Sequence, residues 1–379
     1  IYFGRNVAKR HDELAGGLFR FFPAPFLRAQ FVRTTQWELH SITAIPTSAI
    51  PDEHRDFALE AMKAYFTRRE PSANRPKPPR FDLAILYDPK DPTAPSGDRA
   101  MERFVRAAED LDIAVEIIGK EDYGRLSEFD ALFLRTTTSV NHYTYKFSHR
   151  AAAEGLVVID DPVSILRCTN KVYLAELLAH NDIPAPRTRI VHRDNLTEAA
   201  AYVGYPCILK QPDSSSSRGV VKADDESTLK EQAAQLFETS DLLIAQEFMP
   251  TTYDWRIGVL DRRPLYAAKY HMAPNHWQIL KRNKTTGKVS YGPSEVMPVE
   301  EVPPEGLRLA VKAANLIGDG LYGVDLKQIG NKWFVIEVND NPSIDFRMED
   351  RFLKEDLYRR VMSVFLRRLE ESKERRFGK

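Results

Sequence analysis

The chain has 379 residues, enough for two or three domains that each bury a hydrophobic core. Apolar residues make up 43% and charged residues 28%, and 54 basic residues balance 54 acidic ones, so the composition is ordinary for a globular protein and gives no sign of nucleic-acid or anionic-membrane partners. No apolar run approaches the roughly 18 residues that a membrane span needs.

The first residues and the two cysteines bear on the cellular compartment. Ile1-Tyr2-Phe3-Gly4 contains neither a methionine nor a signal-peptide pattern, so we expect a chain trimmed at its N-terminus. Cys168 and Cys207 form neither a CxxC motif nor a disulfide framework. A reduced, cytoplasmic setting is the simplest interpretation.

Residues 1–70 mix aromatic and basic side chains and carry no recognisable chemistry. A strand is predicted at 36–42, and a helix at 52–68 on the spacing of its apolar residues. The proline-rich stretch 71–80 then predicts a linker, because proline removes hydrogen-bond donors and fixes φ.

Short apolar segments alternate with helical patterns after the linker. Strands are predicted at 82–87, 113–118, 130–134 and 156–159, and helices at 98–111 and 145–154. Such alternation predicts a parallel sheet with crossover helices. The segment has no GxGxxG motif, so a dinucleotide site has little support.

The pattern changes at Asn170, where strands begin to follow one another. Helices are predicted at 171–180, 229–237, 306–317 and 355–369, and strands at 206–211, 220–221, 242–247, 255–260, 264–271, 321–329 and 332–338. The fold class is therefore α/β, with α+β character in parts.

A hairpin near the C-terminal end carries the strongest chemical signal. Glu337 and Asn339 are two residues apart in the predicted strand 333–339, so both side chains face one side. Asp325 precedes the turn at 330–331; a three-residue loop would set it opposite Glu337, and a two-residue loop would be off by one. Two carboxylates and an amide oxygen suit Mg²⁺. The alternative is an acidic strand edge with unrelated charges.

A candidate phosphate site lies upstream. The loop 214–219 is small and polar, so its backbone N–H groups could approach phosphate oxygens closely. Lys210 ends the apolar strand before this loop, and Lys171 begins a helix. A lysine in a mostly buried strand is costly unless it pairs with an anion. The alternatives are an edge lysine that reaches solvent and a loop without a ligand.

The order of these motifs resembles the ATP-grasp superfamily, and more closely the RimK-like carboxylate–amine ligases that carry an extra N-terminal domain. The motifs are Asn170-Lys171, Ile208-Leu209-Lys210, the serine-rich loop ending at Gly219, Gln246-Glu247-Phe248-Met249, Asp254-Trp255-Arg256, Asp325 and Glu337-Val338-Asn339. Phe3-Gly4-Arg5-Asn6 and Ala24-Pro25-Phe26-Leu27 look like the end of the extra domain.

The resemblance covers essentially the whole chain and implies a domain order. It implies an incomplete N-terminal accessory domain over 1–70, the linker 71–80, a parallel α/β pre-ATP-grasp domain over 81–169, and a two-subdomain ATP-grasp domain over 170–370 with a lid at about 185–248.

Roles for individual residues follow from the same resemblance. The nucleotide would be held through its phosphates, adenine and ribose by Lys171, Lys210, Ser215, Ser216, Ser217, Gly219, Gln246, Glu247, Phe248, Met249 and Asp254. Asp325, Glu337 and Asn339 would ligate one or two Mg²⁺ ions, with Mn²⁺ as a substitute. Arg256 would be the catalytic residue that faces the γ-phosphate and the acyl phosphate.

The acceptor side is less well defined. Substrate contacts are predicted for Lys269, Trp277, Ser343 and Arg135, and His276 is a candidate general base. The chain has Asn341-Pro342-Ser343-Ile344 where family members often have a glycine, and 275–278 replaces an Arg-Ser-Asn segment of glutamate-adding members. Glutamate specificity therefore does not transfer directly.

The implied function is an ATP- and Mg²⁺-dependent ligase that acts through an acyl phosphate. It would join a carboxylate to an amine, for example an amino acid such as glutamate to a small molecule, peptide or protein, with no nucleic-acid or membrane partner. The alternatives are an ATP-grasp kinase that phosphorylates a small molecule and a nucleotide-binding regulatory protein without turnover. The two substrates and the oligomeric state, including a homo-oligomer, stay open.

Overall fold

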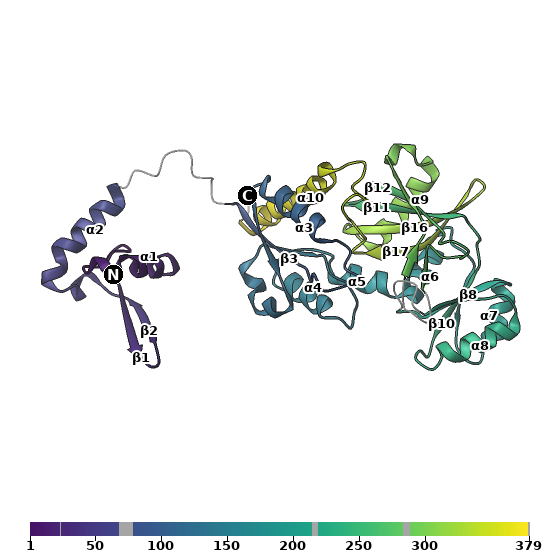
Figure 1. Cartoon of the computed structure of the whole chain (residues 1–379), viewed down its shortest axis with the longest axis horizontal. Coiled ribbons are helices and arrows are strands. Elements are labelled where there is room, and N and C mark those ends of the chain that lie inside the picture. Colours follow the sequence, from purple (N-terminus) through teal and green to yellow (C-terminus); the bar gives the residue numbers. More distant parts are fainter. Residues whose placement is uncertain (23, 68–78, 214–218, 283–288, 378–379) are drawn as a thin grey trace. The chain divides into compact units, whose positions relative to one another are not determined.

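The chain divides into two compact units, Ile1–Pro78 and Pro79–Lys379, which are described separately (Figure 1). The computed structural model describes residues 1–22, 24–67, 79–213, 219–282 and 289–377. The predicted linker 71–80 lies almost entirely outside the described residues.

The first unit is a small arrangement of helices around one β-hairpin. Its elements are η1 (Lys9–His11), α1 (Asp12–Phe21), β1 (Leu27–Arg33), β2 (Trp37–Ala44), η2 (Thr47–Ala49), η3 (Asp52–His54) and α2 (Arg55–Thr67). The strand expected at 36–42 is β2, and the helix expected at 52–68 is α2. The pattern did not predict α1, whose Gly16-Gly17 pair lowers its helix propensity.

The second unit begins with a parallel sheet, which confirms the prediction from the strand–helix alternation. Its strands are β3 (Phe81–Leu86), β4 (Ile113–Ile118), β5 (Ala131–Leu134) and β6 (Val157–Ile159), in the order β4-β3-β5-β6. The connections contain α3 (Asp98–Glu109), η4 (Lys120–Glu128), α4 (Tyr143–Ala153) and α5 (Pro162–Thr169). The central strands β3 and β5 are apolar runs because side chains pack on both faces.

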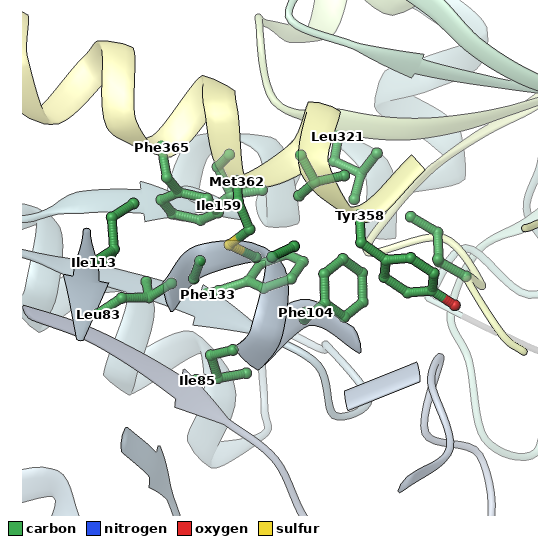
Figure 2. Packing of buried hydrophobic residues seen from close by; sticks show 14 of the residues in the cluster. Leu83, Ile85, Phe104, Ile113, Phe133, Ile159, Leu321, Tyr358, Met362 and Phe365 are labelled. Carbon is green, nitrogen blue, oxygen red and sulfur yellow. The ribbon is translucent and has the colours of Figure 1, made fainter. Parts of the chain in front are cut away.

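One face of this sheet is covered by α3 together with the C-terminal helix α10 (Glu355–Phe377) (Figure 1). Figure 2 shows the aromatic centre of that layer. The Phe133 ring lies between two others, with its centroid 5.1 Å from Phe104 and 5.3 Å from Phe365, both in edge-to-face geometry. Such pairs contribute stability beyond the area they bury.

The Phe365→Ala substitution should therefore destabilise the protein strongly. Phe365 is fully buried, so truncation leaves a cavity against the sheet and should lower the free energy of unfolding by about 3–5 kcal/mol. Chemical denaturation measures the change. Ser363→Ala, at an exposed position of the same helix, should change the unfolding free energy by less than about 0.5 kcal/mol. Equal losses for the two variants would contradict the packing described here.

An antiparallel sheet with its own core follows in the chain. Its strands are β7 (Thr188–Val191), β8 (Cys207–Lys210), β9 (Val220–Ala223) and β10 (Leu243–Glu247), in the order β7-β10-β8-β9. Helices α7 (Leu196–Val203) and α8 (Glu226–Leu236) pack on this sheet, whereas α6 (Lys171–His180), which precedes it in the chain, packs into the core of the five-stranded sheet described next. The sequence pattern did not predict β7 and α7, which are short.

The largest sheet has five antiparallel strands in the order β15-β12-β11-β16-β17. They are β11 (Tyr253–Leu260), β12 (Arg263–His271), β15 (Ser294–Met297), β16 (Leu321–Ile329) and β17 (Lys332–Asp340), with β13 (Leu280–Arg282) and β14 (Val289–Tyr291) as a separate hairpin and η5 (Val299–Glu301) after β15. Helix α9 (Pro304–Ile317) buries its alanine face on one side of this sheet. No helix in the described part of the chain has the length and apolar content that crossing a membrane requires.

Candidate active site

The predicted metal ligands lie on the face of the large sheet that α9 does not cover. A β-bulge determines which residues point to this face. Ile329 pairs with Lys332, so the hairpin turn has two residues. The register then shifts by one beyond the Leu326–Val335 pair, which makes Ile336 an extra residue and sets Asp325 opposite Glu337. The two-residue turn alone would have been off by one, and the bulge compensates for it.

The bulge also reverses the alternation of side chains along β17. Trp333 and Val335 pack into the core under α9 on one side of the bulge, and Val338 does so on the other. Glu337 and Asn339 therefore face away from the helix. Without the extra residue, strict alternation would have pointed both of them into the apolar core.

Arg256 stands on the neighbouring strand β11, directly across from Asp325. Its Nε donates to Asp325 Oδ1 at 2.7 Å and its second guanidinium nitrogen donates to Oδ2 at 2.8 Å, which is a two-pronged pair. The side chains are only 18% and 19% exposed. Burial raises the pKa of Asp325, and the Arg256 charge opposes that rise. The pair thus supplies the positive charge that a desolvated carboxylate needs.

Lys171 forms an ion pair with Glu337, as Arg256 does with Asp325. The side chain of Asn170 caps α6 by accepting from the Val172 and Tyr173 backbone N–H groups, which fixes Lys171 at the helix start. Its Nζ lies 2.9 Å from Glu337 Oε1. Burial would raise the pKa of Glu337, but the Lys171 ammonium and its neighbours prevail and hold that pKa below its usual value.

Lys210 extends from the end of β8 toward the same place. Its Nζ donates to Gln246 Oε1 at 2.7 Å. The pKa of Lys210 is lowered to about 8, chiefly because of burial; the nearby Lys171 charge also lowers it, and Glu337 opposes the change. An ammonium with so low a pKa gains most from an anion placed beside it.

Gly219 borders the loop that was predicted to cradle phosphates. Its φ is +62°, and a Cβ there would lie 2.3 Å from Gln211 Oε1, so the backbone conformation and the space both favour glycine. The backbone N–H of Gln211 also donates to the Gly219 carbonyl at 3.0 Å, so the two residues that flank the loop are hydrogen-bonded to each other. Ser215, Ser216 and Ser217 lie outside the described residues.

The predicted hinge over Gln246 to Met249 begins in the last two residues of β10 and continues just beyond the strand. The Glu247 carboxylate pairs with Arg187 at 3.0 Å. The Phe248 ring contacts Trp277 in edge-to-face geometry with centroids 5.9 Å apart, which brings a predicted substrate residue to the hinge. Asp254 pairs with Lys327, whose Nζ also donates to Thr251 at 2.6 Å.

The other predicted substrate residues lie in different settings. Lys269 lies on the opposite face of the sheet from Arg256, with its Nζ 4.8 Å from the centre of the Trp255 ring in the core under α9. The carbonyl of Ser343 accepts from the Tyr266 hydroxyl at 3.0 Å. His276, the candidate base, lies beside Gln278 with 3.1 Å between Nε2 and Oε1.

Arg135 is fully buried at the end of β5 rather than open to a substrate. Its guanidinium donates to Ser96 Oγ, to Asn341 Oδ1 at 2.9 Å and to the carbonyls of Pro95 and Pro342. These bonds join the parallel sheet to the segment that follows β17. The setting favours a structural role, because the guanidinium is surrounded by protein acceptors.

Lys327 and Glu349, which contribute to the catalytic face, were not predicted from the sequence. Lys327 is two residues beyond Asp325, so strand alternation alone would have placed it beside the predicted metal ligands. Tyr270 on β12 donates to the buried Glu349 at 2.5 Å. No sequence signal marks Glu349, which reaches the site from a segment after the hairpin.

The chemistry of the donor set fits a hard divalent cation. Asp325, Glu337 and Asn339 offer carboxylate and amide oxygens, and the Asn339 amide nitrogen already lies 3.1 Å from Asp325 Oδ2. The three side chains therefore meet at one place. Among the described residues, no group of three or more histidine, cysteine, aspartate or glutamate side chains could hold a metal ion, so the predicted site depends on the Asn339 amide oxygen in addition to its two carboxylates.

Comparison with known proteins agrees with this geometry. Residues 1–61 match the RimK-like ATP-grasp N-terminal domain, and residues 168–364 match the RimK-like ATP-grasp domain. An alpha-aminoadipate–LysW ligase of Saccharolobus solfataricus is 30% identical over 50% of this chain and 67% of its own. A probable alpha-L-glutamate ligase of Legionella pneumophila is 24% identical over 58% and 71%.

Solved structures share the fold of this chain at lower sequence identity. A D-alanine–D-alanine ligase of Bacillus anthracis aligns with 77% of this chain and 99% of its own at a TM-score of 0.60 and 14% identity. With the RimK-like domain covering more than half of the residues, the chain belongs to the RimK-like ATP-grasp family of ATP-dependent carboxylate–amine ligases.

Proposed function

We propose that this chain uses Mg-ATP to convert a carboxylate into an acyl phosphate and then joins it to an amine. The observation that carries the proposal is the charge arrangement on the catalytic face. Four cations surround three carboxylates there: Lys171, Lys210, Arg256 and Lys327 against Asp254, Asp325 and Glu337. Such a face is suited to a polyphosphate that arrives with a divalent cation.

The proposed roles follow the positions of the side chains. Lys171 and Lys210 hold the nucleotide phosphates, with Gly219 and the serines 215–217 as further phosphate contacts. The hinge 246–249 binds adenine, and Asp254 lies near the ribose. Asp325, Glu337 and Asn339 hold Mg²⁺, which when bound neutralises phosphate charge and supports departure of ADP.

The reaction needs two displacements. A carboxylate oxygen of the substrate attacks the γ-phosphorus, and the bond to the ADP oxygen breaks. The amine then attacks the acyl carbon, and inorganic phosphate leaves with the electron pair of the C–O bond. Arg256 lies where charge gathers on the transferred phosphoryl group and lowers the barrier electrostatically. Lys171 and Lys210 orient the chain of phosphates.

An amino acid is the substrate class that the comparisons support. The aligned relatives are an alpha-aminoadipate–LysW ligase and a probable alpha-L-glutamate ligase, so a short acidic amino acid is the first amine to try, with a peptide or protein carboxylate as its partner. The two cysteines are both buried and unpaired, which supports the reduced, cytoplasmic setting predicted from the sequence.

The proposal is tested with Mg-ATP, a panel of free amino acids and short peptides, and hydroxylamine. Hydroxylamine traps any acyl phosphate as a hydroxamate, and mass spectrometry identifies condensation products. We expect ADP, phosphate and a product whose mass equals acid plus amine minus water. A phosphorylated product without condensation would support a kinase instead, and the absence of both hydroxamate and condensation would contradict the proposal.

Nucleotide binding should depend on pH through Lys210. The phosphates stabilise its protonated form, so binding is undiminished below the nucleotide-free pKa of about 8 and weakens as the pH rises above it, by about tenfold per unit until the pKa of the complex is reached. Titration calorimetry with ATP on both sides of that pH measures the slope. Lys210→Arg keeps the charge and should flatten it; an unchanged slope would assign the effect to another group.

A further inference from the structure

A tyrosine–glutamate pair next to Arg256 has no part in the reaction described so far. Tyr270 donates its hydroxyl to Glu349 Oε1 at 2.5 Å, and the other carboxylate oxygen accepts from the Asp345 backbone N–H at 2.9 Å. Glu349 is 3% exposed, whereas Tyr270 is half-buried. The phenol thus connects a buried carboxyl group to the catalytic face.

Strand pairing places Tyr270 beside the catalytic arginine. Tyr270 is the cross-strand partner of Asp254 and lies two residues from the partner of Arg256, so all three side chains share one face. The Arg256 guanidinium carbon lies 5.3 Å from the centre of the Tyr270 ring. A substrate whose acyl phosphate contacts Arg256 would therefore bring its acyl carbon close to the tyrosine.

Glu349 differs from the other carboxyl groups of this face in its partners. Asp254, Asp325 and Glu337 are each paired with a lysine or arginine. Burial would raise the pKa of Glu337, but Lys171 holds it below its usual value, and Arg256 opposes the burial that raises the pKa of Asp325. Glu349 instead accepts from a phenol and a backbone N–H, both of them neutral donors.

The surroundings of Glu349 support a basic role. Burial raises the pKa of Glu349 above its ordinary value, and the Tyr270 hydrogen bond opposes the rise. The charged and titratable groups that face it are Arg256 on β11, Arg135 on β5 and Tyr266 on β12. A carboxylate with a raised pKa accepts a proton near neutral pH more readily than an ordinary one does.

We propose that Tyr270 and Glu349 form the proton relay that deprotonates the attacking amine, an inference that rests on the proposed ligase reaction. As the amine nitrogen bonds to the acyl carbon, its proton passes to the Tyr270 oxygen and the tyrosine proton passes to Glu349 Oε1. Phosphate departs with the electrons of the C–O bond, and Glu349 later returns its proton to solvent. Tyr270 is then a catalytic residue, and Glu349 acts through it.

Acyl-phosphate formation and condensation with the amine can be measured separately, and only the second step needs the proton relay. In Tyr270→Phe and Glu349→Gln, condensation with the amine should fall by about 100-fold, within the range of a positioned acid–base group. Hydroxamate formation should keep the wild-type rate, because hydroxylamine is reactive enough to attack an acyl phosphate with water as the proton acceptor, so it does not need the relay. The double variant should lose no more than either single one, since both belong to one relay.

Matched controls remove equivalent groups elsewhere. Tyr322→Phe deletes a buried hydroxyl from the same sheet, where it bonds Ser164 on the opposite face. Glu355→Gln neutralises an acid of the following segment that pairs with Arg103. Both should condense the amine at the wild-type rate. Equal losses of hydroxamate and condensation in the relay variants would overturn the relay and leave only a bracing role beside Arg256.

A measurement without substrate completes the test. Infrared difference spectra of the free enzyme across a pH series should show a carboxyl group that titrates above the ordinary 4.5 of glutamic acid and disappears in Glu349→Gln. Its absence from the wild-type spectra would overturn the relay even if no substrate had been found. A wild-type protein that forms no hydroxamate with any acid would instead refute the ligase reaction itself.

Discussion

Replacing Arg256 with methionine should lower kcat by about 1,000-fold or more. The guanidinium is the only group of the described catalytic face that combines a planar two-pronged donor with a full charge beside Asp325, and arginines that stabilise a transferring phosphoryl group are worth about 10³–10⁵ in rate. Steady-state ADP release measures the loss. Arg256→Lys should recover only part of the rate, because a lysine cannot form two parallel bonds.

Stability distinguishes the catalytic effect from simple unfolding. Arg256→Met leaves Asp325 buried without its partner and should lower the free energy of unfolding by about 3 kcal/mol. The double variant Arg256→Met, Asp325→Asn should recover most of that stability and none of the activity. Arg263→Met, at an exposed position of β12, is the matched control. Activity within tenfold of the wild type in Arg256→Met would refute the role assigned to the arginine.

Glu337→Gln should reduce turnover by about 10²–10³-fold, the loss typical of removing one electrostatic contact to a transition state. The residue has two functions at once: it is a proposed ligand for Mg²⁺ and it holds Lys171 at 2.9 Å. Its replacement should therefore weaken both cation and nucleotide binding. Glu300→Gln, an exposed acid of η5, should leave turnover unchanged.

Cation binding gives a readout that does not depend on turnover. Arg256 and Lys171 already neutralise the two carboxylates, so Mn²⁺ should bind weakly by itself and more tightly when ADP offers its phosphates to those side chains. Electron paramagnetic resonance of Mn²⁺ measures both affinities. Glu337→Gln should abolish the ADP-dependent increase. An increase of the same size in wild type and variant would exclude Glu337 as a ligand.

Local sequence patterns were sufficient for most regular elements of the second unit. The apolar runs at 82–87 and 130–134 could only be buried strands, because no polar face was available to turn toward water. The alternation with helices then required a parallel sheet. The short β7 and α7 were missed because four to eight residues carry too little periodicity to identify an element.

The chemical identity of the site was likewise contained in the chain. Lys171, Lys210, Arg256, Asp325 and Glu337 were recognised from residue type and order, and the structure brings these five side chains to one place. Lys269 shows the limit of such reasoning. It was predicted to contact the substrate, but adjacent residues of a strand point to opposite faces, and the Lys269 side chain lies beside Trp255 on the face opposite Arg256.

What the sequence determined by itself is therefore most of the regular elements and the family, and it supplied the candidate residues for phosphate and metal binding, since these depend on local pattern and residue type. The tertiary structure decided the register and the distant partners. The bulge at Ile336 turns Glu337 out of the core, and the segment after β17 brings Glu349 to Tyr270, 79 residues away. Both depend on packing between elements far apart in the chain, where no single segment carries the signal.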